Sequence, residues 1–200
     1  MMSPELERLW GLLRLTLQSP AEGARAVIDL GLSRKELWLS LALVTVLSVL
    51  LMALSTGTVM VLPLGVEPLF VSPLGYGMIM GSGLVLLVFA LHYTGQVLGG
   101  TGAFAASLAV VVWLEVMSLA LRLVQVVVGF LSSGLEAVIA LGAAVFLFWC
   151  LIRFTDEVHH FNSVGKSILT LVLALVGISV GITIILTFIG VGATQGLSNV

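Results

Sequence analysis

Residues 168–189 read ILTLVLALVGISVGITIILTFI and contain no charged side chain. A helix needs about 20 apolar residues to cross the hydrocarbon core of a bilayer, so this stretch is long enough to span it. Four further stretches are similarly apolar, which predicts five transmembrane helices. The predicted spans are residues 37–54, 75–96, 104–129, 135–151 and 168–189. The expected fold class is therefore all-α, a polytopic transmembrane helical bundle.

The composition excludes a water-soluble protein. Hydrophobic residues make up 60% of the 200-residue chain and charged residues 9%, and the mean hydropathy is +1.23. Soluble domains carry about 25% charged residues. The spans use up the chain and leave no room for a soluble catalytic domain. The net charge of −2 offers no clustered basic face, so a nucleic-acid partner is not expected.

The first 35 residues are predicted to form a cytoplasmic amphipathic region ahead of the bundle. Apolar residues recur there at the spacing of one helical face, at Leu6, Leu9, Trp10, Leu13 and Leu17. Two capping boxes follow, at residues 19–22, with a proline in the first helical position, and at residues 33–36. The short helices could pack on the cytoplasmic end of the bundle or bind the lipid surface. Residues 36–192 would then form the transmembrane domain and residues 193–200 a short external tail.

Basic residues are distributed unevenly along the chain. The cytoplasmic connections of membrane proteins carry the excess of Lys and Arg. Most of these residues precede the first span or flank the fourth connection, namely Arg8, Arg14, Arg25, Arg34, Lys35, Arg153 and Lys166. The predicted topology therefore has a cytoplasmic N-terminus and an external C-terminus.

Two ionisable residues fall inside the third predicted span. Glu115 and Arg122 are seven residues apart, on one helical face, and Gln125 continues that face. Ionisable groups at membrane depth are costly and face protein or water. One interpretation is a proton or ion relay that also includes His92 of the second span. The alternative is a buried charge that fixes helix packing or docks a partner helix.

Pairs of small residues occur where helices could approach closely. Three pairs have the small-xxx-small spacing: Gly77 and Gly81, Ala140 and Ala144, and Gly177 and Gly181. We expect them to pack helices together. The spacing leaves open whether the contacts lie within one chain or between two copies.

The remaining polar residues contain no complete catalytic or metal-binding pattern. Asp156, Glu157, His159 and His160 are expected in a solvated cytoplasmic connection, and the i, i+4 histidine pattern of zinc sites is absent. Ser82 lies between glycines but lacks the fuller nucleophile motif. The lone Cys150 can form neither a disulfide nor a Cys-based metal site within one chain, and we expect it to be buried. No cofactor, metal or catalytic residue is predicted, and the chain is not expected to be an enzyme.

Several features, taken in order, carry a family resemblance. They are the QSP sequence at 18–20, the five-span layout, LGGTGAF at 98–104 entering the third span, and DEVHHFN at 156–162 before the last span. Together they resemble the Yip1 family of multi-pass membrane proteins, particularly its bacterial branch. The resemblance implies a five-helix integral membrane protein with a cytoplasmic N-terminus, in the inner membrane of a bacterial cell. The chain lacks the Asp-Leu-Tyr-Gly-Pro and Gly-Tyr-x-Leu-x-Pro signatures of the eukaryotic branch, so a Rab-type GTPase is not an expected partner.

The sequence predicts a non-enzymatic membrane scaffold or accessory subunit that acts through helix–helix contacts and its N-terminal platform. The lipid bilayer is the expected partner, and both a homo-oligomer and a larger membrane complex remain open. The alternative function is a small transporter or channel with a polar path through Glu115, Arg122 and His92.

Overall fold

The computed structural model describes residues 3–56, 60–62 and 69–188. Within these ranges the chain forms seven helices and one pair of short strands. The elements, in chain order, are α1 Pro4–Gln18, α2 Pro20–Ile28, α3 Arg34–Thr56, β1 Met60–Leu62, β2 Leu69–Val71, α4 Pro73–Val97, α5 Phe104–Gly129, α6 Ser133–His159 and α7 Val164–Phe188. The predicted all-α helical bundle is confirmed. The predicted tail, 193–200, and the last residue of the fifth predicted span, Ile189, lie outside the described residues.

Five helices in the described part of the chain, α3 to α7, are long and apolar enough to cross a membrane. The third predicted span, 104–129, coincides with α5. Helix α6 differs most from its prediction, because it continues from residue 151 to His159. The extension contains Arg153, Asp156 and Glu157. The span was predicted to end before these residues because they are charged. The helix continues because these side chains find partners within the protein, as described below.

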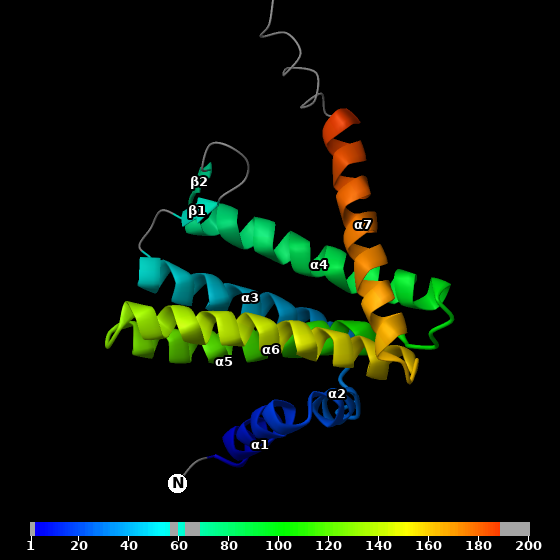
Figure 1. Cartoon of the computed structure of the whole chain (residues 1–200), viewed down its shortest axis with the longest axis horizontal. Coiled ribbons are helices and arrows are strands. Elements are labelled where there is room, and N and C mark those ends of the chain that lie inside the picture. Colours follow the sequence, from blue (N-terminus) through cyan, green and yellow to red (C-terminus); the bar gives the residue numbers. More distant parts are fainter. Residues whose placement is uncertain (1–2, 57–59, 63–68, 189–200) are drawn as a thin grey trace, which may run out of the picture.

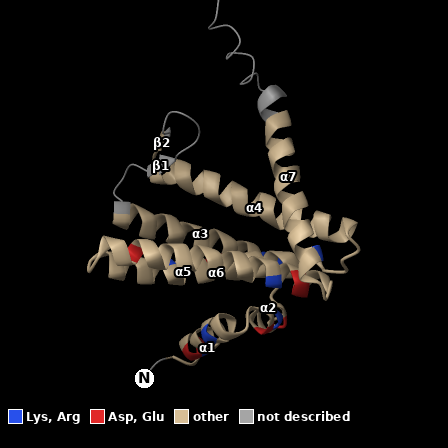
Figure 2. Ribbon diagram, in the orientation of Figure 1, with Lys and Arg blue, Asp and Glu red and all other residues tan. Residues whose placement is uncertain are grey.

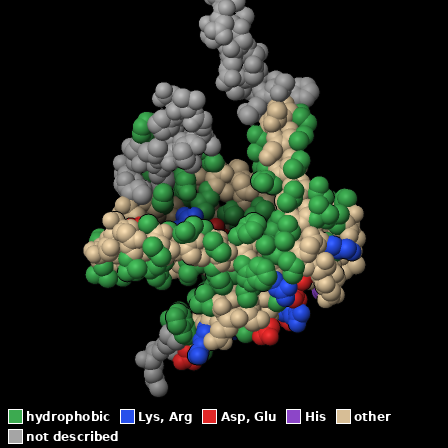
Figure 3. Space-filling view, viewed as in Figure 1, with side chains coloured by type: hydrophobic (Ala, Val, Ile, Leu, Met, Phe, Trp, Pro, Cys, Tyr) green, Lys and Arg blue, Asp and Glu red, His purple; other side chains and the backbone are tan. Residues whose placement is uncertain are grey.

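Helix α5 lies at the centre of the packing. It contacts α2, α3, α4 and α6, and half of its most apolar stretch is buried. Figure 1 shows α3, α5 and α6 lying side by side, with α4 above them and α7 crossing α4 at a steep inclination. The outer surfaces of α6 and α7 are covered with hydrophobic side chains (Figure 3), as expected for helices that face lipid.

The bundle has two distinct ends. The α2 end contains the start of α3, the turn between α4 and α5, and the corner between α6 and α7. The far end contains the last turns of α3 and α5 and the first turns of α4 and α6. A two-stranded antiparallel pair, in which Met60 faces Val71, lies beside the start of α4 (Figure 1). This strand pair was not predicted.

The two N-terminal helices occupy different environments. Helix α2 packs against α5 and α6, and its Ala24 and Val27 belong to the hydrophobic core. The indole Nε1 of Trp113 donates a 2.9 Å hydrogen bond to Oγ1 of the buried Thr16 at the end of α1. Trp113 lies nine residues into α5, about 14 Å along that helix. The N-terminal helices therefore pack along the side of the bundle, while α1 leaves Leu6, Trp10 and Leu17 exposed.

The two predicted capping boxes have different outcomes. In the second, Ser33 N donates to Glu36 Oε2 at 2.7 Å and Glu36 N donates to Ser33 Oγ at 3.3 Å, so the reciprocal pair is confirmed. The first is wrong, because Ser19 makes no side-chain capping bond. Ser19 is also the C-cap of α1, where its backbone N–H donates to Leu15 O. One residue joins two helices there, and Pro20 starts the second without needing a bonded N–H.

Candidate functional site

Two segments that are far apart in the sequence meet at the α2 end of the bundle. Residues 95–102 close the turn between α4 and α5, and residues 156–162 form the corner between α6 and α7. The backbone N–H of Thr101 donates to His159 O at 3.3 Å. We call this contact region the junction. It comprises Arg25, Gly95, Gly100, Gly102, Asp156, Glu157, Val158 and His159.

Glycines allow α6 to approach this turn closely. A Cβ atom at Gly95 or at Gly100 would overlap the ring of His159. A Cβ atom at Gly102 would overlap the carbonyl oxygen of Val158. His159 is 2% exposed, and its Nε2 lies 3.1 Å from Leu91 O. Because a carbonyl can only accept, Nε2 carries the proton, and Nδ1 remains without a partner among the described residues.

Glu157 connects the junction to α2. Arg25 Nε donates to Glu157 Oε2 at 2.5 Å, and Arg25 Nη2 donates to Glu157 Oε1 at 2.9 Å. This two-bond geometry is the strong form of the Arg–carboxylate pair. The hydrogen bond to Glu157, followed by the attraction of its charge, raises the pKa of Arg25 above its ordinary value. The pairing therefore favours the charged guanidinium, which is the form that arginine already has at physiological pH.

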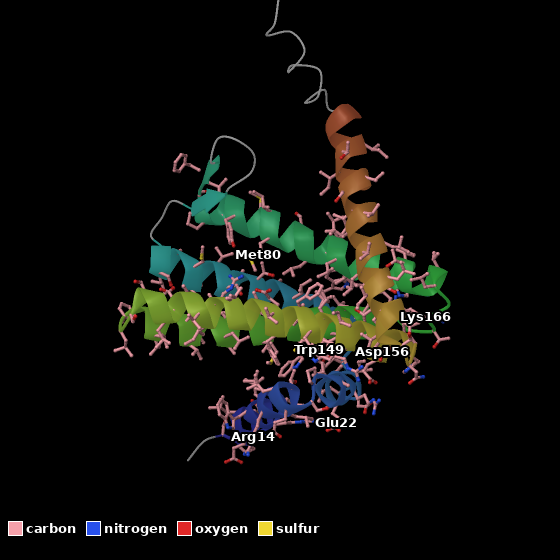
Figure 4. All side chains as sticks on the ribbon, in the orientation of Figure 1. Arg14, Glu22, Met80, Trp149, Asp156 and Lys166 are labelled. Carbon is pink, nitrogen blue, oxygen red and sulfur yellow. The ribbon has the colours of Figure 1, made fainter. Side chains whose placement is uncertain are left out.

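Asp156 connects the junction to α7. Its Oδ1 accepts from Ser163 N at 2.9 Å and from Ser167 Oγ at 3.4 Å. Arg153 lies 3.6 Å from its Oδ2. Figure 4 shows Asp156 at the corner where α6 ends and α7 begins. The backbone turns there through His160 and Asn162, whose φ values of 54° and 50° are left-handed. Asp156 therefore fixes the start of α7 immediately after this tight corner.

The expectation of a solvated connection at Asp156, Glu157 and His159 was wrong. All three are buried in the last turns of α6. They serve different partners: Asp156 bonds to the start of α7, Glu157 to α2 and His159 to α4. The described residues accordingly contain no group of three metal-ligating side chains. Arg25 was missed as a site residue, because its partner lies 132 positions away in the sequence.

The predicted intramembrane polar residues fall into three separate environments. Glu115 is 6% exposed, and its Oε1 accepts a 2.6 Å hydrogen bond from Ser48 Oγ of α3. Arg122 and Gln125 line a cavity of about 290 Å³ at the far end. His92 is buried towards the α2 end, where its ring and the ring of Phe104 are nearly perpendicular, with their centroids 5.4 Å apart. No ion pair links Glu115 to Arg122 in the described ranges.

The small-residue pairs also differ in what they meet. A Cβ at Gly77 would lie 3.3 Å from Val49, and one at Gly81 would lie 3.7 Å from Thr45, so this pair faces α3. Ala140 is half-buried and Ala144 is exposed. A Cβ at Gly177 or Gly181 would meet nothing within 4 Å. These two glycines instead line an apolar cavity of about 270 Å³ between α4 and α7.

We predict that Gly95→Ala destabilises the protein, because the added methyl group would overlap the His159 ring. Overpacking of this kind costs typically about 1–3 kcal/mol. Cys150 is a buried free thiol, so its reaction with a thiol-reactive fluorophore during heating in detergent would measure the unfolding temperature. We expect Gly95→Ala to lower this temperature by several degrees.

Gly142→Ala is the matched control for Gly95→Ala, because Gly142 also lies inside a helix and its added Cβ meets nothing within 4 Å. This control should be neutral or slightly stabilising, since alanine favours helix by about 1 kcal/mol. In a His159→Ala background the methyl group gains space, so Gly95→Ala should cost less there. An equal loss of stability in both backgrounds would contradict the assigned contact.

The chain is similar to a known protein family. The family model for the Yip1 domain matches residues 14–196, which is most of the chain and includes both segments of the junction. No curated protein and no solved structure matches the chain significantly. The five apolar helices and the family match make the protein a multi-pass membrane protein. The chain belongs to the Yip1 family.

Proposed function

We propose that this protein is a non-enzymatic membrane scaffold or accessory subunit that holds α1 in a fixed position beside its transmembrane bundle. The single observation that carries the proposal is the attachment of α2. The paired hydrogen bonds of Arg25 with Glu157, and the burial of Ala24 and Val27, attach α2 to α5 and α6. The hydrogen bond between Thr16 and Trp113 attaches the end of α1.

The exposed face of α1 supports a role in contacts with a partner. Leu6, Leu9, Trp10 and Leu17 remain 40–63% exposed on this helix although its end is anchored. Tryptophan is enriched at the centres of protein interfaces and at membrane–water boundaries. We propose that this face packs against a helix of a partner membrane protein, while the junction keeps it from moving relative to the bundle.

The geometry favours this function over the transporter alternative. A relay needs aligned polar groups and a path for water. Glu115 is engaged by Ser48, and neither Glu115 nor His92 lines the cavity that contains Arg122. At the α2 end, the close contacts of His159 with Gly95 and Gly100 fill the space between α4 and α6. These features support a packing role for the buried charge.

We also propose that the α2 end faces the cytoplasm of the cell and that the protein lies in the inner membrane. All Lys and Arg residues except Arg122 belong to α1, α2 or the helix ends at the α2 end. Figure 2 shows the basic residues of α1 below the bundle and most of the others near the α2 end. Positive charge marks the cytoplasmic side of membrane proteins. Residues 1–35 would then form the cytoplasmic platform, residues 36–192 the transmembrane domain and residues 193–200 an external tail.

A photo-crosslinking amino acid at position 10 tests the scaffold proposal. In native membranes it should form an adduct with one second protein chain of defined mass, detected by gel shift and mass spectrometry. Position 8 is the control, because it lies on the opposite face of the same exposed helix. In a Glu157→Ala background, which removes the partner of Arg25, the yield at position 10 should fall several-fold. Adducts with lipid alone at position 10 would refute the proposal.

Reconstitution in liposomes tests the transporter alternative. We expect proton and ion fluxes at the level of protein-free vesicles for the wild type, because Glu115 is engaged by Ser48 and neither Glu115 nor His92 lines the cavity that contains Arg122. Glu115→Gln should leave this level unchanged, since the amide can still accept the hydrogen bond of Ser48. A wild-type flux well above background that Glu115→Gln abolishes would favour the transporter.

The proposed topology predicts opposite accessibility of the two chain ends. Single cysteines at positions 5 and 200, in a Cys150→Ser background, would be labelled in intact cells with a thiol reagent that does not cross membranes. Position 200 should react in intact cells, whereas position 5 should react only after the membrane is opened. Labelling of both positions from the same side would contradict the predicted orientation.

A further inference from the structure

The far end of the bundle contains a polar cavity that the proposed function does not use. Residues from four helices line this cavity of about 290 Å³. Its polar residues are Ser55 of α3, Tyr76 of α4, Arg122 and Gln125 of α5, and Glu136 of α6. Ser55 Oγ donates to Leu51 O at 2.8 Å. We call this space the far-end cavity.

The other four polar side chains of the far-end cavity have no hydrogen-bonding or ion-pairing partner in the described part of the chain. Tyr76, Arg122, Gln125 and Glu136 make no side-chain hydrogen bond there, and neither Arg122 nor Glu136 forms an ion pair. A charged side chain within a span is costly unless it is paired or solvated. One cation and one anion therefore face the same cavity without pairing with each other.

The position of the far-end cavity fits the headgroup layer of a bilayer. Ser55 is in the last turn of α3, and Tyr76 and Glu136 are in the first turns of α4 and α6. Arg122 lies seven residues before the end of α5, about 10 Å deeper, and its long side chain can extend towards the surface. Arg122 is the one basic residue among the described residues that line the cavity.

A neighbouring space gives the site an apolar extension. A second cavity of about 460 Å³ shares Leu51, Ser55, Val126 and Glu136 with the far-end cavity. Leu54, Gly129 and Phe130 complete its wall, and Leu54 and Phe130 are 85% and 87% exposed. A ligand that fits both spaces has a small charged part and an adjoining apolar part. Pockets for drug-sized ligands measure about 300–1,000 Å³. The polar space of about 290 Å³ is at the lower limit of this range, so it is suited to a small group such as a headgroup.

We propose that the far-end cavity binds the phosphoethanolamine headgroup of a membrane phospholipid. The guanidinium of Arg122 would donate to the phosphate, as the planar fork of arginine is suited to do. The carboxylate of Glu136 would accept from the ammonium group. Tyr76 and Gln125 supply further hydrogen-bonding groups, and the acyl chains would occupy the apolar extension. A phosphoglycerol headgroup lacks the ammonium and could offer Glu136 only neutral hydroxyl donors.

Native mass spectrometry with defined lipids tests this proposal. The detergent-purified full chain would be titrated with phosphatidylethanolamine and, separately, with phosphatidylglycerol of the same acyl chains. We expect the wild type to prefer phosphatidylethanolamine roughly tenfold, the equivalent of about 1.4 kcal/mol. Glu136→Gln should reduce this preference to about onefold, because the ammonium loses its charged acceptor. Arg122→Gln should weaken the binding of both lipids by about tenfold.

Controls separate this site from general lipid contact and from a free ligand. Glu115→Gln makes the same chemical change at a residue that does not line the cavity, and should leave the preference intact. Should Arg122→Gln fail to fold, Arg122→Lys keeps the charge and should still lose part of the affinity. Soluble glycerophosphoethanolamine should displace the bound lipid poorly. If it displaced the bound lipid as well as intact phosphatidylethanolamine does, the lipid assignment would be overturned. A wild type without preference, or an unchanged preference in Glu136→Gln, would overturn the proposal.

Discussion

The close approach of α6 to the turn between α4 and α5 determines how the rest of the bundle is arranged. Lipid provides no hydrophobic force that presses helices together, so membrane helices associate through close packing and polar contacts. Here Gly95 and Gly100 make room for His159, and Gly102 makes room for the backbone at Val158. This contact brings the end of α6 to the depth at which Glu157 reaches Arg25. The positions of α2 and of the start of α7 both follow from it.

Polar groups are used differently at the two ends of the bundle. At the α2 end, the carboxylates of Asp156 and Glu157 each bond to another element and hold it in place. At the far end, Arg122 and Glu136 share a cavity and remain unpaired within the described residues. Paired charges of the first kind fix the structure, whereas unpaired charges at headgroup depth are suited to a ligand that carries both signs.

Composition and local spacing were sufficient to predict the helices but not the junction. The apolar runs predicted five spans, and the Ser33–Glu36 box depends on two residues that are close in sequence. The junction depends on pairings that local patterns cannot reveal. Glu157 was predicted to be solvated because its partner, Arg25, is 132 positions away in the sequence. Glu115 and its partner Ser48 are 67 positions apart. For Glu115, the sequence predicted only that the side chain would face protein or water, because a charged group is costly in lipid.

The contrast between the two ends also bears on what a bound lipid would do. Movement of a headgroup across the membrane would need a polar route from the far-end cavity to the α2 end. Glu115 is the next acidic residue along α5, but it is buried and engaged by Ser48. Beyond it, α5 presents the apolar buried residues Leu108, Val110 and Val111, and the His159 contacts fill the junction. A lipid at the far end would therefore be a resident ligand that contacts α3, α4, α5 and α6, the four helices that line the far-end cavity. In that arrangement the glycine contacts hold one end of the bundle and the lipid holds the other, which is consistent with a scaffold whose helices keep fixed positions.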